Sequence, residues 1–558
     1  MLLVLIYWIV TFFVAICFGD IISMLWNRFS QSENKYSLPD LFWLGLAFIA
    51  SLSCFTSLFL PLNIYVKAVI VAITIVYWGI ERIKFISLLK VPVSFFNALP
   101  LFQKIGAILI LFLLLAYSLS IPTGYDINLY HLQSLIWNEQ YSVVPGLGNL
   151  HGRLSFNSNS LLLYNIFSFH SGYFTPNFAI NGLCILVFSF WTLKKISERS
   201  HVWEMAGMYV LLFIFYFAFA GGISSSSTDI LANIIVLYLF LKIILDTSSF
   251  KKTPLVFLIL PFFCLTLKIS VAFIVLLSLP VLLFALKERN YRIIGASVFC
   301  ALFLLLPWLT RSVVLSGYLV YPFPAIDIFT FDWKIPLDAV LEEKEAIVTY
   351  AKVNFLPQSE VAVMPFSEWI PIWFKNLSKL YALTYILCAL SPLVFVYVRL
   401  RQTEIDKTLF LVWGIAFLGA LFGFVNAPDP RFSIASLLCV FIIPFFFILK
   451  IKVASNMLHL LNIAACIIVL LFMAKAVKDM IPYQKESALT LVYKPQDFYY
   501  VKKYFNISFK KNQMAEGIIY SPDSGDQCYD HCIPCSPYLD KKMEFRGFSL
   551  GEGFRMKK

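Results

Sequence analysis

The residues of this chain that could do chemistry lie in short polar segments between long apolar ones. The richest of these segments runs over residues 124–160 and contains Asp, His, Arg, Asn and Ser side chains. Asp126, Tyr130 and Gln133 have i, i+4, i+7 spacing, so a helix that begins here would place them on one face. A carboxylate in such surroundings suits a general base acting on a lipid-linked substrate, although an Asp can also simply cap a helix and face water. We therefore take Asp126 as the candidate catalytic residue, with six candidate substrate ligands around it: Tyr130, His131, His151, Arg153, Asn157 and Asn159.

Three cations lie in other polar turns, each at the end of an apolar run. Lys268 separates two such runs, Arg311 ends another, and Arg431 begins one. Charge inside a bilayer is costly and is often functional, although a lone Lys can also extend to the interface. Arg binds phosphate through a bidentate fork, and Lys binds it as a point charge. We expect these three cations to form a pocket for a lipid phosphate.

Two further carboxylates are candidate substrate ligands. Asp229 ends the hydroxyl-rich segment Ser224-Ser-Ser-Ser-Thr-Asp229, which could bind an acceptor sugar or peptide. N-capping by a hydroxyl, with Asp229 favoured by the helix dipole, accounts for the same pattern. Asp429 lies two residues before Arg431 and is either a ligand or a structural partner of that Arg.

A cysteine cluster lies in the polar C-terminal region. Cys528, Cys532 and Cys535 with His531 could form a metal site, but a structural zinc site needs four ligands and this spacing is irregular. A tail outside the cytoplasm is in an oxidising compartment, which favours a disulfide. We expect a disulfide between Cys528 and Cys535.

The elements that position these residues are predicted to be membrane spans. Of the 558 residues, 60% are hydrophobic and 14% are charged, against about 45–50% and about 25% in soluble domains. This composition excludes a soluble enzyme, a coiled coil and a disordered chain. A bilayer core needs about 20 apolar residues per helix, and runs of that kind predict about fourteen spans. They lie near 1–19, 41–60, 64–80, 102–120, 176–193, 203–221, 229–245, 254–267, 269–286, 293–316, 380–398, 408–425, 433–449 and 456–474.

The distribution of Lys and Arg predicts how the chain is oriented. With these spans, six loops rich in Lys and Arg fall on one face, which the positive-inside rule makes cytoplasmic. They lie near 82–104, 194–199, 251–252, 287–292, 399–407 and 450–452. These loops explain much of the net charge of +12, so we expect no nucleic-acid partner. The opposite face receives the first outer loop (121–175), the second large outer loop (317–379) and the polar tail (477–558).

The order of these elements resembles a known superfamily. From the span near 102–120, a helix rising from the cytoplasmic side leads into a large outer loop with Asp126 near its start. About ten more spans and an outer tail follow. This layout is similar to that of the GT-C superfamily of integral-membrane glycosyltransferases, which includes protein mannosyltransferases, aminoarabinose transferases and oligosaccharyltransferases.

The resemblance implies an all-α polytopic membrane fold. We expect a GT-C-like transmembrane core over 102–476, preceded by extra N-terminal transmembrane helices over 1–101 and followed by a small periplasmic C-terminal tail domain over 477–558. Several short segments also look like a family of bacterial multispanning proteins of unassigned function. They are Gly124-Tyr-Asp126, Tyr130-His131, Phe156-Asn-Ser-Asn-Ser160, Ala427-Pro-Asp-Pro-Arg-Phe432 and Gly551-Glu-Gly-Phe-Arg555.

In the GT-C superfamily the first outer loop carries a catalytic Asp, and the donor is a sugar on a polyprenyl phosphate or diphosphate. The resemblance gives that role to Asp126, which would deprotonate or orient the acceptor hydroxyl for inversion at the anomeric carbon. Many relatives have a second carboxylate beside it, whereas this chain reads Asp126-Ile-Asn128. The resemblance therefore gives little support to a divalent metal, and we expect no cofactor. Lys268, Arg311 or Arg431 could neutralise a monophosphate-linked donor.

The implied function is an inverting glycosyltransferase of the bacterial inner membrane with its active site facing the periplasm. Its expected partners are a polyprenyl-phosphate-linked sugar donor, a cell-envelope glycan, lipid or protein acceptor, and membrane lipids. One alternative is an O-antigen polymerase or ligase, which would rely on Arg pairs in a long later loop, but the 317–379 loop has no Arg. Another is a lipid-linked oligosaccharide flippase or other transporter, a class that usually shows internal repeats; we find none here.

Overall fold

The structure is a computed structural model that describes residues 2–118, 124–167, 179–198, 223–401, 406–448 and 507–557, with a few positions in 206–214 and 463–471. The expected spans near 203–221 and 456–474 lie largely outside the described residues. So do 121–123 and 168–175 of the first outer loop and 477–506 of the tail.

Long apolar helices make up most of the described chain. Eight of them are long and apolar enough to cross a membrane, and α3 (Ile64–Ile80) with α4 (Arg82–Ala98), bent by 99°, would be a ninth. The eight are α1 (Leu2–Ser30), α2 (Leu38–Ser57), α9 (Ile180–Ser197), α11 (Thr228–Leu245), η4 with α14 (Ile269–Lys287), α15 (Tyr291–Ser316), α19 (Lys379–Leu400) and α20 (Lys407–Asn426). The chain is a multi-pass membrane protein.

The described residues have fewer full-length spans than the apolar runs predicted. Three of the runs form shorter helices: α5 (Leu101–Tyr117), α13 (Pro254–Leu267) and α21 (Ile434–Ile442), which the π-helix η6 (Ile443–Ile448) extends. A helix of 14 residues, such as α13, is shorter than the ~20 residues that cross a bilayer core. An apolar run therefore predicts a helix more reliably than it predicts a complete crossing.

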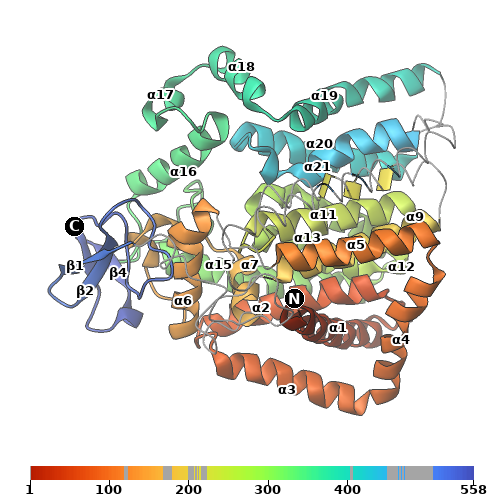
Figure 1. Ribbon diagram of the computed structural model, residues 1–558, viewed down its shortest axis with the longest axis horizontal. Coiled ribbons are helices and arrows are strands. Elements are labelled where there is room, and N and C mark those ends of the chain that lie inside the picture. The colour runs from red at the N-terminus through yellow and green to blue at the C-terminus, as the bar shows by residue number, and fades with distance from the viewer. Residues whose placement is uncertain are drawn as a thin grey trace.

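The two ends of the helical bundle differ in character. Figure 1 shows α4 and α12 (Ser249–Lys252), which carry Lys and Arg, at one end, and the strands of the C-terminal region at the other. We call these the basic end and the tail end. At the basic end, the Lys242 ammonium of α11 lies 2.9 Å from the Asp40 carboxylate of α2. α11 is the central helix, because 78% of its residues are buried in the described structure.

Helices α1 and α2 pack unusually closely. A Cβ on Gly19 would overlap the backbone of Leu41, and a Cβ on Gly45 would overlap the backbone of Ala15. Small residues at such a crossing let two backbones approach, which is the main source of helix association in a membrane.

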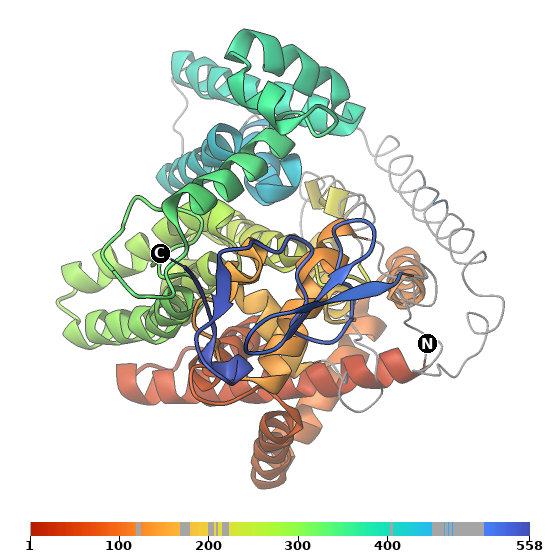
Figure 2. The ribbon, with the colours of Figure 1, turned by 90° about the vertical axis from the view of Figure 1, so that its left-hand side faces the viewer.

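The described part of the C-terminal tail, residues 507–557, consists mainly of short strands and turns. Strands β1 (Phe509–Gln513) and β2 (Ile518–Pro522) form an antiparallel pair, and β3 (Met543–Phe545) and β4 (Phe554–Met556) form another. Figure 2 shows these strands lying across the tail end of the bundle, over the segment that follows α5. The all-α prediction therefore holds for the described membrane helices, and the described part of the tail is a small β structure.

The segment after α5 folds into short helices at the tail end. The π-helix η1 (Ile127–His131) continues as α6 (Leu132–Gln140), so the helix predicted near Asp126 is present. The 3-10 turns η2 (Leu147–Asn149) and η3 (Gly152–Ser155) and then α7 (Asn159–Ile166) follow. Side chains of this segment, such as Trp137 and Leu150, share one hydrophobic cluster with Phe545 and Phe554 of the tail.

We expect Gly45→Leu to destabilise the protein by about 1–3 kcal/mol, because the side chain would force α1 and α2 apart. The measurement is the thermal unfolding midpoint in detergent. Gly79→Leu on α3 is the matched control, since a Cβ there meets nothing within 4 Å. Equal midpoints for the two variants would contradict the close packing of α1 and α2.

Candidate functional site

A cavity of about 470 Å³ lies at the tail end of the bundle. Its wall combines η1, η3, the turn before α11, the junction of α13 with η4, one side of α15, and α16 (Leu337–Lys352). The junction between α20 and the 3-10 turn η5 (Pro430–Phe432) completes it. The candidate base and two of the three candidate phosphate-binding cations singled out from the sequence line this cavity. They are Asp126, Lys268 and Arg431.

Arg153 connects two carboxylates at one side of the cavity. Its Nη1 lies 3.0 Å from Asp126 Oδ1, and its Nε lies 3.1 Å from Glu343 Oε1. The Glu343 side chain comes from α16, so the guanidinium links the 124–160 segment to α16. Burial raises the pKa of the Glu343 carboxyl, while the attraction of Arg153 opposes that rise. The Asp126 carboxylate is partly open, with 36% of its side chain exposed, so a ligand hydroxyl can reach it.

Lys268 and Arg431 occupy another part of the wall. Lys268 Nζ forms an ion pair with Asp229 and lies 4.3 Å from the centre of the Phe432 ring. Arg431 Nε lies 2.9 Å from Asp429 Oδ2, which is the structural pairing anticipated for that Asp. Each of these two cations already has a carboxylate partner. An incoming phosphate would therefore compete with that carboxylate for the cation.

Lys344 is a cation of a different kind. It lines the cavity from α16, and its ammonium lies 5.6 Å from the centre of the Phe323 ring. No carboxylate within the described part of the chain forms an ion pair with it. Lys344 can therefore meet an anion without giving up a partner.

The neutral polar groups of the wall are held by the backbone or by buried partners. His131 Nδ1 lies 3.0 Å from Ser226 Oγ, and burial lowers the pKa of the His131 ring to about 4. Asn157 and Trp308 make reciprocal bonds: Asn157 Nδ2 donates to the Trp308 carbonyl, and Trp308 Nε1 donates to the Asn157 carbonyl, both at 2.6 Å. The Tyr130 ring packs edge-to-face on Phe156, 5.5 Å between ring centres. The wall is therefore fixed before a ligand binds.

Four predicted ligands lie outside this lining: Arg311, His151, Asn159 and Asp429, the partner of Arg431. Arg311 is buried and donates from Nη2 to Asn138 Oδ1 at 2.6 Å, so its expected place in the phosphate pocket is wrong. Trp308 and Ser312 are the residues of α15 that line the cavity, and Arg311 lies about 100° around the helix from Ser312. Its guanidinium turns towards Asn138 of α6 and Ser57 of α2 instead of towards the cavity.

His151 and Asn159 do not line the cavity either. The His151 ring lies 6.3 Å from the Tyr538 ring of the tail. Asn159 Nδ2 donates to Thr266 Oγ1 at 3.0 Å and so joins α7 to α13. Both residues therefore contact elements that surround the cavity and do not face the cavity itself.

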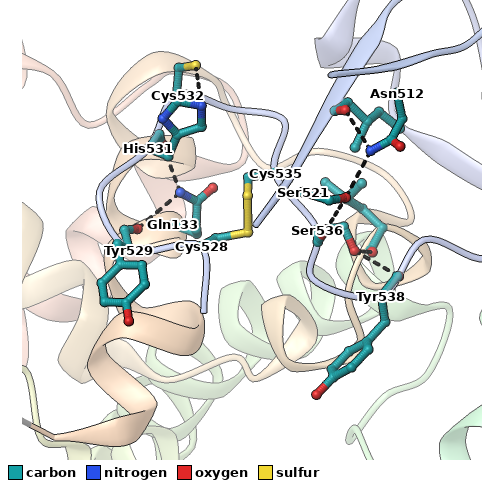
Figure 3. The surroundings of a disulfide bond; sticks show 12 residues. Gln133, Asn512, Ser521, Cys528, Tyr529, His531, Cys532, Cys535, Ser536 and Tyr538 are labelled. Carbon is teal, nitrogen blue, oxygen red and sulfur yellow. Dashed lines mark hydrogen bonds between the residues drawn. A yellow bond between two sulfur atoms is a disulfide. The ribbon is translucent and has the colours of Figure 1, made fainter. Parts of the chain in front are cut away.

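The C-terminal tail holds the Asp126 segment from outside. The Tyr529 amide donates to the Asn128 carbonyl at 2.8 Å. Gln133 Nε2 donates to the carbonyls of Tyr529 at 3.1 Å and His531 at 2.8 Å, as Figure 3 shows. Gln133, which shares the predicted helix face of Asp126, thus binds the tail. Asn128 and Gln133 belong to the two helical turns that follow Asp126.

A disulfide closes the loop that makes these contacts. Cys528 and Cys535 are bonded, the pair favoured from the sequence, and each is 1% exposed. Cys532, between them, is an exposed free thiol. In the described part of the chain, no three His, Cys, Asp or Glu side chains gather in a way that could hold a metal ion.

The sequence reasoning missed the contribution of α16. Glu343, Lys344 and Tyr350 bring a carboxylate, an ammonium and a ring to the site, and the Arg431 guanidinium lies 5.7 Å from the centre of the Tyr350 ring. The available signal was the charged run Glu342-Glu-Lys-Glu345 in the second outer loop.

The chain belongs to the family described as "Domain of unknown function (DUF8201)", whose model matches residues 1–438. That range includes Asp126, Arg153, Lys268, Glu343 and Arg431. The chain has no match among curated proteins and none among solved structures.

We expect Cys528→Ser with Cys535→Ser to loosen the Asp126 segment, because the closed loop that binds Asn128 and Gln133 would gain conformational freedom. The loss for a short loop is about 2 kcal/mol. Hydrogen exchange of peptides over 124–140 should speed up. Cys532→Ser is the matched control and should leave exchange unchanged, whereas unchanged exchange in the double variant would contradict the role of the loop.

His131 should make the protein acid-sensitive. Its folded-state pKa of about 4 lies below the ordinary value of about 6.5, so the folded state needs the neutral ring. This stabilisation is fully present above about pH 6.5 and is lost as the pH falls towards about 4. We expect His131→Gln to reduce the loss of thermal stability between about pH 7 and pH 5. An unchanged loss in that variant would show that His131 is not the group responsible.

Proposed function

We propose that this member of the DUF8201 family is a membrane glycosyltransferase of GT-C type. It would transfer a sugar from a polyprenyl-phosphate-linked donor to a hydroxyl of a cell-envelope glycan, lipid or protein. The observation that carries the proposal is that Asp126, Lys268 and Arg431, from three distant parts of the sequence, line one cavity at an end of a membrane-helix bundle. In such a cavity the base would accept the proton of the acceptor hydroxyl, and the two cations would neutralise the leaving phosphate.

The Asp126 carboxylate would act as the general base. It would take the proton of the acceptor hydroxyl while that oxygen attacks the anomeric carbon of the donor sugar. The bond between the anomeric carbon and the phosphate oxygen would break, and its electron pair would leave with the polyprenyl phosphate. Attack opposite to the leaving group inverts the anomeric configuration. Arg153, 3.0 Å from Asp126, would hold the carboxylate in one orientation.

The leaving phosphate would be bound by cations of the cavity. Lys268 and Arg431 would have to exchange a carboxylate for the phosphate, whereas Lys344 has no such partner in the described chain. Lys344 would therefore receive the phosphate first, and Lys268 or Arg431 would complete its neutralisation. The wall also contains apolar and aromatic side chains, including Trp308, which suit a sugar ring and the first units of a polyprenyl chain.

The proposed orientation places the cavity on the periplasmic side of a bacterial inner membrane. It is supported by the separation of the basic end, with α4 and α12, from the tail end (Figure 1). The positive-inside rule would put the basic end in the cytoplasm. The polyprenyl-linked donor could then reach the cavity from the periplasmic leaflet.

A specific observation favours a transporter of lipid-linked sugars as a second candidate. Asp40 and Lys242 form a buried pair between α2 and α11, and the Tyr238 hydroxyl donates to Asp40 at 2.7 Å. Ionisable residues buried in spans often mark transport pathways. This pair lies at the basic end, on a different side of the bundle from the cavity.

We expect Asp126→Asn to lower sugar transfer by about 10²–10⁴-fold, because the amide cannot accept the acceptor proton. The assay incubates purified protein with radiolabelled polyprenyl-phosphate sugar and an envelope extract. Asp246→Asn, at the basic end, is the matched control, since that carboxylate pairs with Lys252 and lies far from the cavity.

Undiminished transfer in Asp126→Asn would remove this residue from the catalytic role. No transfer by the unaltered protein with any donor, combined with scrambling of lipid-linked sugar in proteoliposomes, would instead support the transporter.

A further inference from the structure

The second outer segment forms an arm beside the cavity. It consists of α16 (Leu337–Lys352), α17 (Gln358–Val363) and α18 (Phe366–Asn376), and α19 begins three residues after α18 ends. Figure 1 shows α16, α17 and α18 running from the tail strands to the near end of α19. The arm contributes no candidate span, yet it carries many apolar side chains.

One side of α18 is anchored to two candidate membrane spans. Trp369 and Trp373 are both 7% exposed. The Trp373 ring lies 4.9 Å from Tyr385 of α19 and 5.5 Å from Phe424 of α20. Trp373 Nε1 also donates to the Pro428 carbonyl at 2.7 Å. Tyr385 is in the second turn of α19 and Phe424 in the last turn of α20, so α18 lies at the level where these helices end.

The arm also exposes large apolar side chains, one of which, Phe366, packs edge-to-face on Trp369 at 5.4 Å between ring centres. The exposed fractions are 81% for Val363, 63% for Phe366, 59% for Phe355 and 39% for Phe374. Exposing apolar side chains to water is unfavourable, so a cluster of them indicates a contact with lipid or with another protein. None of these residues lies in a candidate span, so the bilayer core around the bundle does not by itself account for them.

Basic residues accompany this apolar surface. Lys375 follows Phe374, and Lys379 opens α19 four residues later. Lys352 ends α16. Aromatic side chains next to Lys, on a helix with one apolar side, are typical of helices that lie in the headgroup region of a membrane.

We propose that the 337–376 arm is a membrane-docking surface, with Phe355, Val363, Phe366 and Phe374 inserted at the boundary of headgroups and acyl chains. The occupant is a lipid surface because the anchoring of α18 to α19 and α20 fixes the arm at the level of the bilayer surface. Lys375 and Lys379 would meet lipid phosphates there. This inference does not depend on the proposed chemistry.

Helix α16 connects the arm to the cavity. The same arm that would touch lipid also lines the cavity with Lys344, Ile347 and Tyr350. A membrane-bound arm would therefore hold one wall of the cavity against the lipid surface, where an amphiphilic ligand arrives.

The test uses the full-length protein in vesicles of phosphatidylethanolamine and phosphatidylglycerol. The photoreactive p-benzoylphenylalanine replaces Phe366 in one variant and Val363 in another. In the control it replaces Phe548, which is 97% exposed on the C-terminal tail. Irradiation is followed by mass spectrometry of the labelled peptide. All three positions are exposed, and p-benzoylphenylalanine keeps a phenyl ring at position 366, where Phe366 packs on Trp369.

We expect phospholipid adducts at positions 363 and 366, at least several-fold above those at 548. Cross-links to a second copy of the chain at 363 and 366 would overturn the proposal in favour of a dimer contact. Adduct levels equal to those at 548 would overturn it in favour of an arm that lies in water. Either result would leave the Asp126 chemistry untouched, since the sugar-transfer assay tests that separately.

Discussion

Placing ionisable groups beside a low-dielectric bilayer is costly unless each charge has a partner, and this constraint organises the tail end of the structure. Arg153 meets Asp126 and Glu343, Lys268 meets Asp229, and Arg431 meets Asp429. The Arg153–Glu343 pair joins segments 190 residues apart, and the Lys268–Asp229 pair joins the junction of α13 with η4 to the start of α11. The ion pairs therefore shape the cavity as well as compensating the charges within it.

The C-terminal tail solves a second problem, which is how to fix a short polar segment that has little apolar surface of its own. Trp137 and Leu150 of that segment share a hydrophobic cluster with Phe545 and Phe554 of the tail. The disulfide-closed loop adds backbone bonds immediately after Asp126. The position of the candidate base thus depends on residues about 400 positions later in the chain.

What the sequence could predict follows from the range of the interactions involved. Asp126, Lys268 and Arg431 stand out because charge is rare in so apolar a chain, and they do share a cavity. Arg311 stands out for the same reason but faces Asn138, because its direction depends on the rotation of α15 about its axis. Helix rotation is set by packing against neighbouring helices, which a single sequence does not reveal.

Glu343 and the tail strands illustrate a different limit. Glu343 matters because α16 folds back to within 3.1 Å of Arg153, a contact between residues 190 positions apart. No local pattern encodes such a contact. The tail likewise has short strands of three to five residues, whose alternation is too brief to separate from a loop. Apolar runs thus identified the membrane helices, while the site itself arises from long-range pairing.

The pairing of charges also bears on which ligand the cavity can accept. Four cations, Arg153, Lys268, Lys344 and Arg431, stand beside four carboxylates, Asp126, Glu343, Asp229 and Asp429. The site is therefore close to neutral, and a bound phosphate must displace a carboxylate or bind where a cation is free. Lys344 is that cation within the described chain, and it lies on the arm proposed to touch lipid. A single phosphate would have to displace at most one carboxylate from its cation, whereas a diphosphate would have to displace more. The charge balance therefore favours a monophosphate-linked donor in the proposed reaction.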